Sequence, residues 1–163
     1  MFKKLLTSIV MMGCVYSANA ENGRHTDRLT MSEYIADNYS ISEAESRRII
    51  QSVQKHARLM KIDPKIVFGI IRVESGFDRK AYNRGSYGLM QIQKKWHRDL
   101  IKGRDLLNID VNIEVGTKIF KNCMEKHRAD VKRALLCYNG GGDPFYPKKI
   151  TAAQRELNNF KLS

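Results

Sequence analysis

Cysteine and proline are scarce in this sequence. Each accounts for three of the 163 residues, so a miniprotein scaffold held together mainly by disulfides is excluded. The chain has no internal repeat, no low-complexity tract and no linker rich in proline, glycine or serine, and its length favours a single domain. Hydrophobic residues make up 42% and charged residues 28%, close to ordinary globular usage, which excludes intrinsic disorder and a collagen-like repeat.

Acidic residues are outnumbered. The chain has 29 Lys and Arg against 17 Asp and Glu, a net charge of +12. Such an excess suits a nucleic-acid binder, a protein that acts on an anionic polymer, or a protein at a membrane surface. The basic residues are scattered, and the pair Lys148-Lys149 is too short to form a patch. We therefore expect no nucleic-acid partner.

An uncharged apolar run lies near the N-terminus. Residues 1–20 carry Lys3 and Lys4 near their start, continue through this run and end on Ala-Asn-Ala, the pattern of a secretory signal peptide. The run is too short to span a bilayer as a stable helix. We expect cleavage after Ala20, export to the periplasm, and no stable membrane span in the mature chain. A buried N-terminal helix and lipidation at Cys14 are the alternatives.

Two cysteines, Cys123 and Cys137, would remain after cleavage, in an oxidising compartment. A disulfide between them would close a loop of about 15 residues and contribute roughly 3 kcal/mol in the loop-entropy model. Two buried free thiols are the alternative. The leader holds two of the 29 basic residues and none of the 17 acidic ones, so the mature chain would carry a net charge of +10.

The rest of the chain predicts short helices in one mainly α domain. Ser42 and Glu45 form a capping box, which opens a helix with apolar residues at helical spacing. Asp63-Pro64 supplies an N-cap and a first-turn proline for a second helix, which ends near Gly76. Residues 77–93 predict an irregular stretch or a small hairpin. Four more helices are expected after it: one near 94–102, one that is capped by Asp110 and ends at about 126, one near 130–138 and one near 150–160.

One face of the second helix ends in a carboxylate. Val67, Ile70, Ile71 and Glu74 fall at i, i+3, i+4 and i+7 and so share a face. Desolvation beside the apolar residues and the negative end of the helix dipole would both raise the pKa of Glu74. A raised pKa is what a general acid needs near neutral pH. A solvated glutamate at a helix end is the alternative.

Two further patterns place polar groups beside glycine. In the run that starts at Gly88, glycine permits close backbone approach and Gln91 offers both a donor and an acceptor. Tyr138 and Asn139 supply a phenol and an amide just before another glycine run. These groups suit the hydroxyls and N-acetyl groups of sugars. An ordinary helix stop and the edge of the core are the alternatives.

The order and spacing of these motifs strongly resemble the soluble lytic transglycosylase domain family. The resemblance covers roughly residues 44–142 and is carried by Glu74-Ser75-Gly76, Gly88-Leu89-Met90-Gln91-Ile92, Asn112-Ile113 with Gly116, and Tyr138-Asn139-x-Gly141. Members cleave the glycan strands of bacterial peptidoglycan and have a lysozyme-like fold. The small size, the leader and the single domain look most like members attached to secretion, conjugation or pilus machines.

The resemblance implies a domain plan and a set of site residues. It implies a mainly α, lysozyme-like α+β domain over 42–163, after the signal peptide (1–20) and an N-terminal extension with a first short helix (21–41). Glu74 takes the place of the family's single catalytic acid/base. Five more residues match substrate-binding positions: Ser75 beside the acid, Met90 and Gln91 on the cleft floor, and Tyr138 and Asn139 near the catalytic carboxyl.

This sequence departs from the family pattern at two points. Cys137 stands where the family usually has alanine, a nearly isosteric change that frees it to pair with Cys123. The run after Asn139 is altered to Gly142-Asp143-Pro144-Phe145, so we expect the far end of the cleft to differ.

By the same resemblance, one carboxyl replaces the two that ordinary glycosidases use. Glu74 would protonate the glycosidic oxygen between MurNAc and GlcNAc, then accept the proton of the MurNAc C6 hydroxyl, giving a 1,6-anhydro product. No metal and no organic cofactor is needed. The histidines show no close ligand spacing; they are His25, His56, His97 and His127.

Two other function classes stay open. A hydrolase on the same fold, like the goose-type lysozymes, would need a positioned water and a second carboxylate. A non-catalytic wall-binding module would tolerate the loss of Glu74. The candidate second carboxylates have no motif around them and are each expected to be solvated or capping; they are Asp78, Asp99, Asp105 and Asp110.

Overall fold

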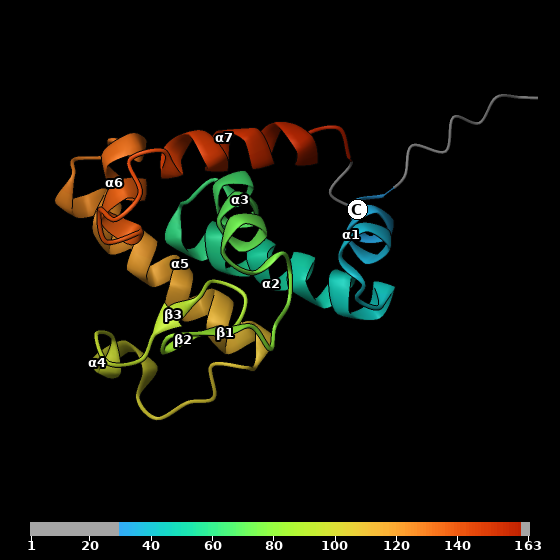
Figure 1. Ribbon diagram of the computed structural model, residues 1–163, viewed down its shortest axis with the longest axis horizontal. Coiled ribbons are helices and arrows are strands. Elements are labelled where there is room, and N and C mark those ends of the chain that lie inside the picture. Colours follow the sequence, from blue (N-terminus) through green and yellow to red (C-terminus); the bar gives the residue numbers. More distant parts are fainter. Residues whose placement is uncertain (1–29, 161–163) are drawn as a thin grey trace, which may run out of the picture.

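The computed structural model describes residues 30–160, and the predicted signal peptide lies outside this range (Figure 1). Within it the chain forms seven helices and a small sheet, which confirms the mainly α fold. No helix in this range is long and apolar enough to cross a bilayer. The elements are α1 (Met31–Tyr39), α2 (Glu43–Met60), α3 (Pro64–Ser75), β1 (Tyr82–Asn83), β2 (Ser86–Tyr87), β3 (Ile92–Gln93), α4 (Arg98–Ile101), α5 (Ile109–Lys126), α6 (Val131–Tyr138) and α7 (Tyr146–Leu157).

The sheet is a three-stranded antiparallel meander in the order β1-β2-β3. Strand β2 is central, and its residue Tyr87 pairs with Tyr82 on one side and Ile92 on the other. In Figure 1 the sheet and α4 lie at one end of the molecule, away from α6 and α7, and α5 runs between the two ends. The hairpin expected over 77–93 is therefore present and extended by a third strand.

Helix α3 is the central element of the core. Asp63 caps its N-terminus by accepting a hydrogen bond from the Lys65 N–H, and Gly76 ends it at a φ of 56°, as the sequence predicts. The helix packs against α7 at Gly69, where a Cβ atom would lie 3.0 Å from Cγ2 of Ile150. This close approach fixes α7 over the helix that carries Glu74.

The capping box predicted at Ser42 forms only in part. The Ser42 side chain accepts from the Glu45 N–H, but the Glu45 carboxylate lies 3.4 Å from Arg79 Nε instead of returning to the cap. A complete capping box lies one helix earlier, between Thr30 and Glu33. The tertiary ion pair therefore competes with the local capping bond at α2.

Three predicted helix bounds need correction. The helix expected near 94–102 is reduced to α4, because the chain leaves β3 in a turn closed by the Trp96 N–H and the Gln93 carbonyl. Helix α5 is capped by Asn108 and not by Asp110, whose carboxylate binds α2. Helix α7 begins at Tyr146 and not near 150, and Pro147 fits its first turn.

Candidate active site

Glu74 lies in the last turn of α3 and is partly buried. Val67, Ile70 and Ile71 on the same face are fully buried, as the spacing predicts. Oε1 of Glu74 accepts a 2.6 Å hydrogen bond from the Tyr146 hydroxyl at the start of α7. Burial raises the pKa of Glu74 above its ordinary value of 4.5, and the hydrogen bond from Tyr146 offsets only part of this rise.

A cavity of about 400 Å³ opens beside Glu74. Among the residues that the structure describes, Glu74 is the only carboxylate in its lining. The rest of the lining is polar or aromatic on most sides, which suits a carbohydrate more than an apolar ligand. The lining residues are Glu74, Ser86, Gln91, Ile92, Gln93, Trp96, His97, Ile119, Cys137, Tyr138, Asn139 and Gly140.

Tyr138, the last residue of α6, forms part of the cavity wall. Its hydroxyl donates a 2.7 Å hydrogen bond to the Met90 carbonyl, and its ring meets Phe120 edge-on. Burial and the negative charge of Glu74 raise the pKa of Tyr138 well above its ordinary value. The phenol therefore stays protonated and ties α6 to the segment between β2 and β3.

Ser75 and Met90 lie behind the cavity and are not part of its lining. The Ser75 hydroxyl lies 2.8 Å from the Leu89 carbonyl oxygen, so it ties the end of α3 to the same β2–β3 segment. The Met90 side chain is fully buried and packs against Gly116 of α5. This corrects the expected place of the Met90 side chain: apolar burial takes it into the core, and it supports the cleft floor from below.

Asn112 of α5 holds the β2–β3 segment from the other side. Its buried amide accepts from the Met90 N–H at 2.8 Å and donates to the carbonyls of Tyr87 at 2.9 Å and Leu106 at 2.8 Å. Gly88 has a φ of +71°, and a Cβ atom there would collide with the Asn112 side chain. The glycine in this motif therefore permits the approach of a side chain within the protein.

Gln91 and Asn139 line the cavity, and each side-chain amide uses only one of its two polar atoms in hydrogen bonds to the part of the protein that the structure describes. Gln91 Nε2 donates to the carbonyls of Ala81 and Gly88, and within residues 30–160 its Oε1 accepts no hydrogen bond. Asn139 Oδ1 accepts from the Asp143 N–H at 2.9 Å, and its amide nitrogen has no partner in the same range. One free acceptor and one free amide donor thus border the cavity, as a sugar hydroxyl or N-acetyl group would require.

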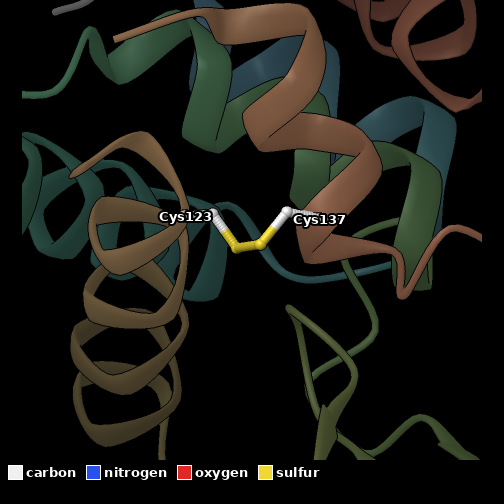
Figure 2. Close-up of a disulfide and its surroundings, with 2 residues drawn as sticks. All are labelled: Cys123 and Cys137. Atoms are coloured by element: carbon white, nitrogen blue, oxygen red, sulfur yellow. A yellow bond between two sulfur atoms is a disulfide. The ribbon is translucent and has the colours of Figure 1, made fainter. Parts of the chain in front are cut away.

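A disulfide between Cys123 and Cys137 joins α5 to the end of α6 (Figure 2), as the sequence predicts. The Cα atoms are 5.8 Å apart. Cys137 lines the cavity and directly precedes Tyr138. The bridge therefore restrains the part of the wall that carries Tyr138 and Asn139.

The family model described as the Transglycosylase SLT domain matches residues 51–160. The chain belongs to this family. The match extends from α2 through α7 and contains Glu74, the β2–β3 segment and Tyr146. Membership supports lytic transglycosylase-type cleavage of peptidoglycan as the general activity, with peptidoglycan as the substrate.

Three residues of this SLT domain site were not anticipated in their roles. Tyr146 lacks any local motif, and only the packing of α7 on α3 brings it to Glu74. His97 lines the cavity, and burial lowers its pKa. Trp96 is 70% exposed and lines the cavity, so it lies at the cleft edge.

None of the four candidate second carboxylates lines the cavity of the SLT domain. Asp78 and Asp105 accept hydrogen bonds from backbone N–H groups two residues further on, and Asp99 is exposed. Burial would raise the pKa of Asp110, but hydrogen bonds from Lys55, His56 and Ser52 hold it at about 2. Asp78, Asp99 and Asp105 are therefore solvated or engaged in local turns, whereas Asp110 is neither a free solvated carboxylate nor the cap of α5, because its carboxylate binds α2.

One acidic cluster forms that sequence spacing does not show. His56, Asp110 and Glu114 bring ligand-type atoms within 4.8 Å of one another, although His56 and Asp110 are 54 positions apart. Lys55 Nζ lies 3.0 Å from Asp110 and Arg104 lies 2.9 Å from Glu114. Both carboxylates are thus already paired with cations, and the cluster ties α2 to α5.

Proposed function

We propose that this protein is a peptidoglycan lytic transglycosylase with Glu74 as its sole acid/base. The observation that carries the proposal is the position of Glu74. It is the only carboxylate lining the cavity among residues 30–160, within an SLT domain, and burial raises its pKa. A mechanism with two carboxylates has no second candidate in this lining.

In the first step, protonated Glu74 donates its proton to the glycosidic oxygen between MurNAc and GlcNAc. The bond from C1 to that oxygen breaks, and GlcNAc leaves with a hydroxyl group. The raised pKa of Glu74 supports this role, since it enlarges the protonated fraction at a given pH. The N-acetyl group of the substrate stabilises the positive charge at C1, where other glycosidases use a second carboxylate.

In the second step, ionised Glu74 accepts the proton of the MurNAc C6 hydroxyl. The C6 oxygen bonds to C1, which closes the 1,6-anhydro ring and returns Glu74 to its protonated form. The Tyr146 hydroxyl stabilises the ionised carboxylate between the two steps through its hydrogen bond to Oε1. Because the attacking hydroxyl belongs to the same sugar, its effective concentration is high and no water is consumed.

The polar groups around the cavity would orient the sugars. Gln91 Oε1 is available to accept from a hydroxyl, and the Asn139 amide nitrogen is available to donate to an N-acetyl oxygen. The exposed ring of Trp96 at the edge offers a flat apolar surface for a sugar face. No organic cofactor and no metal takes part in the proposed steps.

We also propose that the protein acts in the periplasm and opens the wall locally for a secretion, conjugation or pilus machine. The signal-peptide pattern of residues 1–20 supports export, and membership of the SLT family supports action on the wall. N-terminal sequencing of the protein from a periplasmic fraction tests the first part. A chain that begins at Glu21 is expected, whereas an uncleaved chain in the cytoplasm would contradict it.

The activity is tested by digesting purified peptidoglycan with residues 21–163 and identifying the products by mass spectrometry. Fragments that end in anhydro-MurNAc, lighter by one water than reducing-end fragments, are expected. The Glu74→Gln variant should give no such fragments. Reducing ends would instead indicate a hydrolase, and wall binding without any cleavage would indicate a binding module.

A further inference from the structure

A second hollow, here called the basic pocket, lies beside the sheet. Its volume is about 480 Å³, and four of its seven lining residues are cations. Within the described part of the chain the lining contains no carboxylate. The lining residues are Arg84, Gly85, Tyr87, Gln93, Lys94, Lys95 and Arg98.

The four cations of the basic pocket are exposed and have no anionic partner. Between residues 30 and 160, no carboxylate oxygen lies within 4.0 Å of any of their side-chain nitrogens, whereas Arg72, Arg79 and Arg104 all have such partners. Four like charges around one hollow repel one another, and an anion placed among them relieves this repulsion. The pocket therefore favours a ligand that carries negative charge.

The basic pocket adjoins the cavity that contains Glu74. Gln93 of β3 lines both hollows, and its partner in the sheet, Ser86, lines the cavity. Lys95 of the pocket lies with Nζ 4.7 Å from the ring centre of Trp96, which lines the cavity. The two hollows are therefore neighbours that share Gln93, so the basic pocket lies within reach of a side branch on a ligand bound in the cavity.

We propose that the basic pocket binds the carboxylates of the stem peptide attached to a sugar in the cleft. The inference rests on the proposed function, which places a peptidoglycan strand in the cavity. The sugars of such a strand are largely uncharged, and its stem peptides branch off sideways and carry the carboxylates. The charge of the pocket and its position beside Gln93 match this branch. The pocket thereby selects peptide-bearing strands over bare glycan.

The test compares two fourfold variants in the Glu74→Gln background, so that binding is measured without cleavage. The pocket variant is Arg84→Gln/Lys94→Gln/Lys95→Gln/Arg98→Gln. The control variant removes the same number of lysines and arginines from exposed positions that form no ion pair within residues 30–160: Arg58→Gln/Lys118→Gln/Lys132→Gln/Arg155→Gln. Circular dichroism and thermal unfolding verify that both variants are folded.

Binding is measured by co-sedimentation with intact peptidoglycan and with strands from which an amidase has removed the stem peptides. Amide hydrolysis leaves a lactyl carboxylate on each MurNAc ring, so the stripped strands lose the peptide charges but keep this one. The pocket variant should bind intact peptidoglycan about tenfold more weakly than the control variant, because several exposed charge contacts of modest strength are lost together. On stripped strands, whose remaining lactyl carboxylates lie on the sugar rings and not on a peptide branch, the two variants should differ much less. Raising the salt concentration should abolish the difference on intact peptidoglycan.

Two results would overturn the inference. One is equal binding of the two variants to intact peptidoglycan at low salt. The other is a loss of binding by the pocket variant that is not specific to the stem peptide. A loss that is just as large on stripped strands would make the pocket a glycan contact, and a loss that appears only with phosphatidylglycerol vesicles would make it a membrane contact. Cleavage by the unsubstituted protein is assayed separately. Peptide-dependent binding without any cleavage would therefore refute the proposed activity and leave the inference standing.

Discussion

The Tyr146 hydroxyl donates a 2.6 Å hydrogen bond to Oε1 of Glu74, which lies 72 positions earlier in the chain. The two residues come from α7 and α3, whose packing is further held by a 2.7 Å ion pair between Glu156 and Arg72. Tyr34 of α1 also donates to Glu156, at 2.6 Å. The carboxyl of Glu74 is therefore oriented by a helix that is fixed on α3 near both of its ends.

Replacing Tyr146 with phenylalanine should lower the cleavage rate by roughly tenfold to a hundredfold, the usual effect of losing a hydrogen bond to a charged group. The hydrogen bond lowers the pKa of Glu74, so its loss raises that pKa further. The reaction starts from protonated Glu74, and its rate falls as pH rises through this pKa. The falling limb of the profile of kcat/KM against pH should therefore move to higher pH.

Tyr34→Phe is the matched control, since it removes a tyrosine hydrogen bond to a carboxylate away from the cavity. In this variant the falling limb of kcat/KM against pH should lie at the same pH as in the unsubstituted protein. An unmoved falling limb in Tyr146→Phe would show that this hydrogen bond does not tune the catalytic carboxyl.

Glu74→Gln should reduce cleavage by about 10²-fold or more, as loss of a general acid does, while leaving the protein at least as stable at neutral pH. The folded-state pKa of Glu74 lies above 4.5, so this residue's contribution to stability is lost as pH rises through that pKa. The amide has no such loss. Thermal unfolding across pH should show a Tm advantage for Glu74→Gln that shrinks as pH falls from the folded-state pKa toward 4.5 and is absent below it.

Glu125→Gln, at an exposed carboxylate of α5, is the matched reference for the effect of a Glu→Gln change outside the cavity. A lower Tm for Glu74→Gln at neutral pH would contradict the assignment of an unfavourably buried carboxylate.

Gly88→Ala and Gly85→Ala separate backbone strain from packing in the segment that supports the cleft floor. Both glycines have positive φ, +71° and +86°. A Cβ atom at Gly85 meets nothing within 4 Å, whereas one at Gly88 collides with Asn112 and the Leu106 carbonyl. Gly85→Ala should cost about 1 kcal/mol of unfolding free energy, and Gly88→Ala about 3 kcal/mol or more. Denaturant unfolding measures both, and equal losses would refute the packing argument.

Removing the disulfide should cost about 3 kcal/mol of unfolding free energy, the loop-entropy value for a loop of this length. The double variant Cys123→Ala/Cys137→Ala should also cleave more slowly, because the bridge restrains the wall next to Tyr138. A reductant should lower the Tm of the unsubstituted protein toward that of the variant and leave the variant unchanged. If the reductant lowered the Tm of both proteins equally, its effect would not come from the Cys123–Cys137 disulfide.

Local patterns in the sequence predict the elements that depend on neighbouring residues. The cap at Asp63-Pro64 and the i, i+3, i+4, i+7 face ending in Glu74 are properties of one helix, and both are found as expected. The mainly α fold and the SLT family follow from motifs that stand in a characteristic order along the chain. The disulfide is expected because only Cys123 and Cys137 would remain in an oxidising compartment, and the packing of α6 on α5 supplies the geometry that the sequence does not show.

The features that the sequence does not predict are set by tertiary contacts. Asp110 and Asn108 are both good N-cap residues, and contacts of Asp110 with α2 decide between them. A motif match at Met90 cannot tell whether its side chain or its backbone faces the cleft, and packing on Gly116 takes the side chain inward. The role of Tyr146 depends on α7 lying over α3, for which no local pattern exists.

The pairing of Glu74 with Tyr146 also sets an order of events during synthesis. The carboxyl is made with α3, but its partner hydroxyl follows 72 positions later, at the start of α7. A growing chain that ends before α7 holds Glu74 without the group that orients it. The pair is therefore completed only after α7 has been synthesised, and a truncation that removes α7 removes half of it.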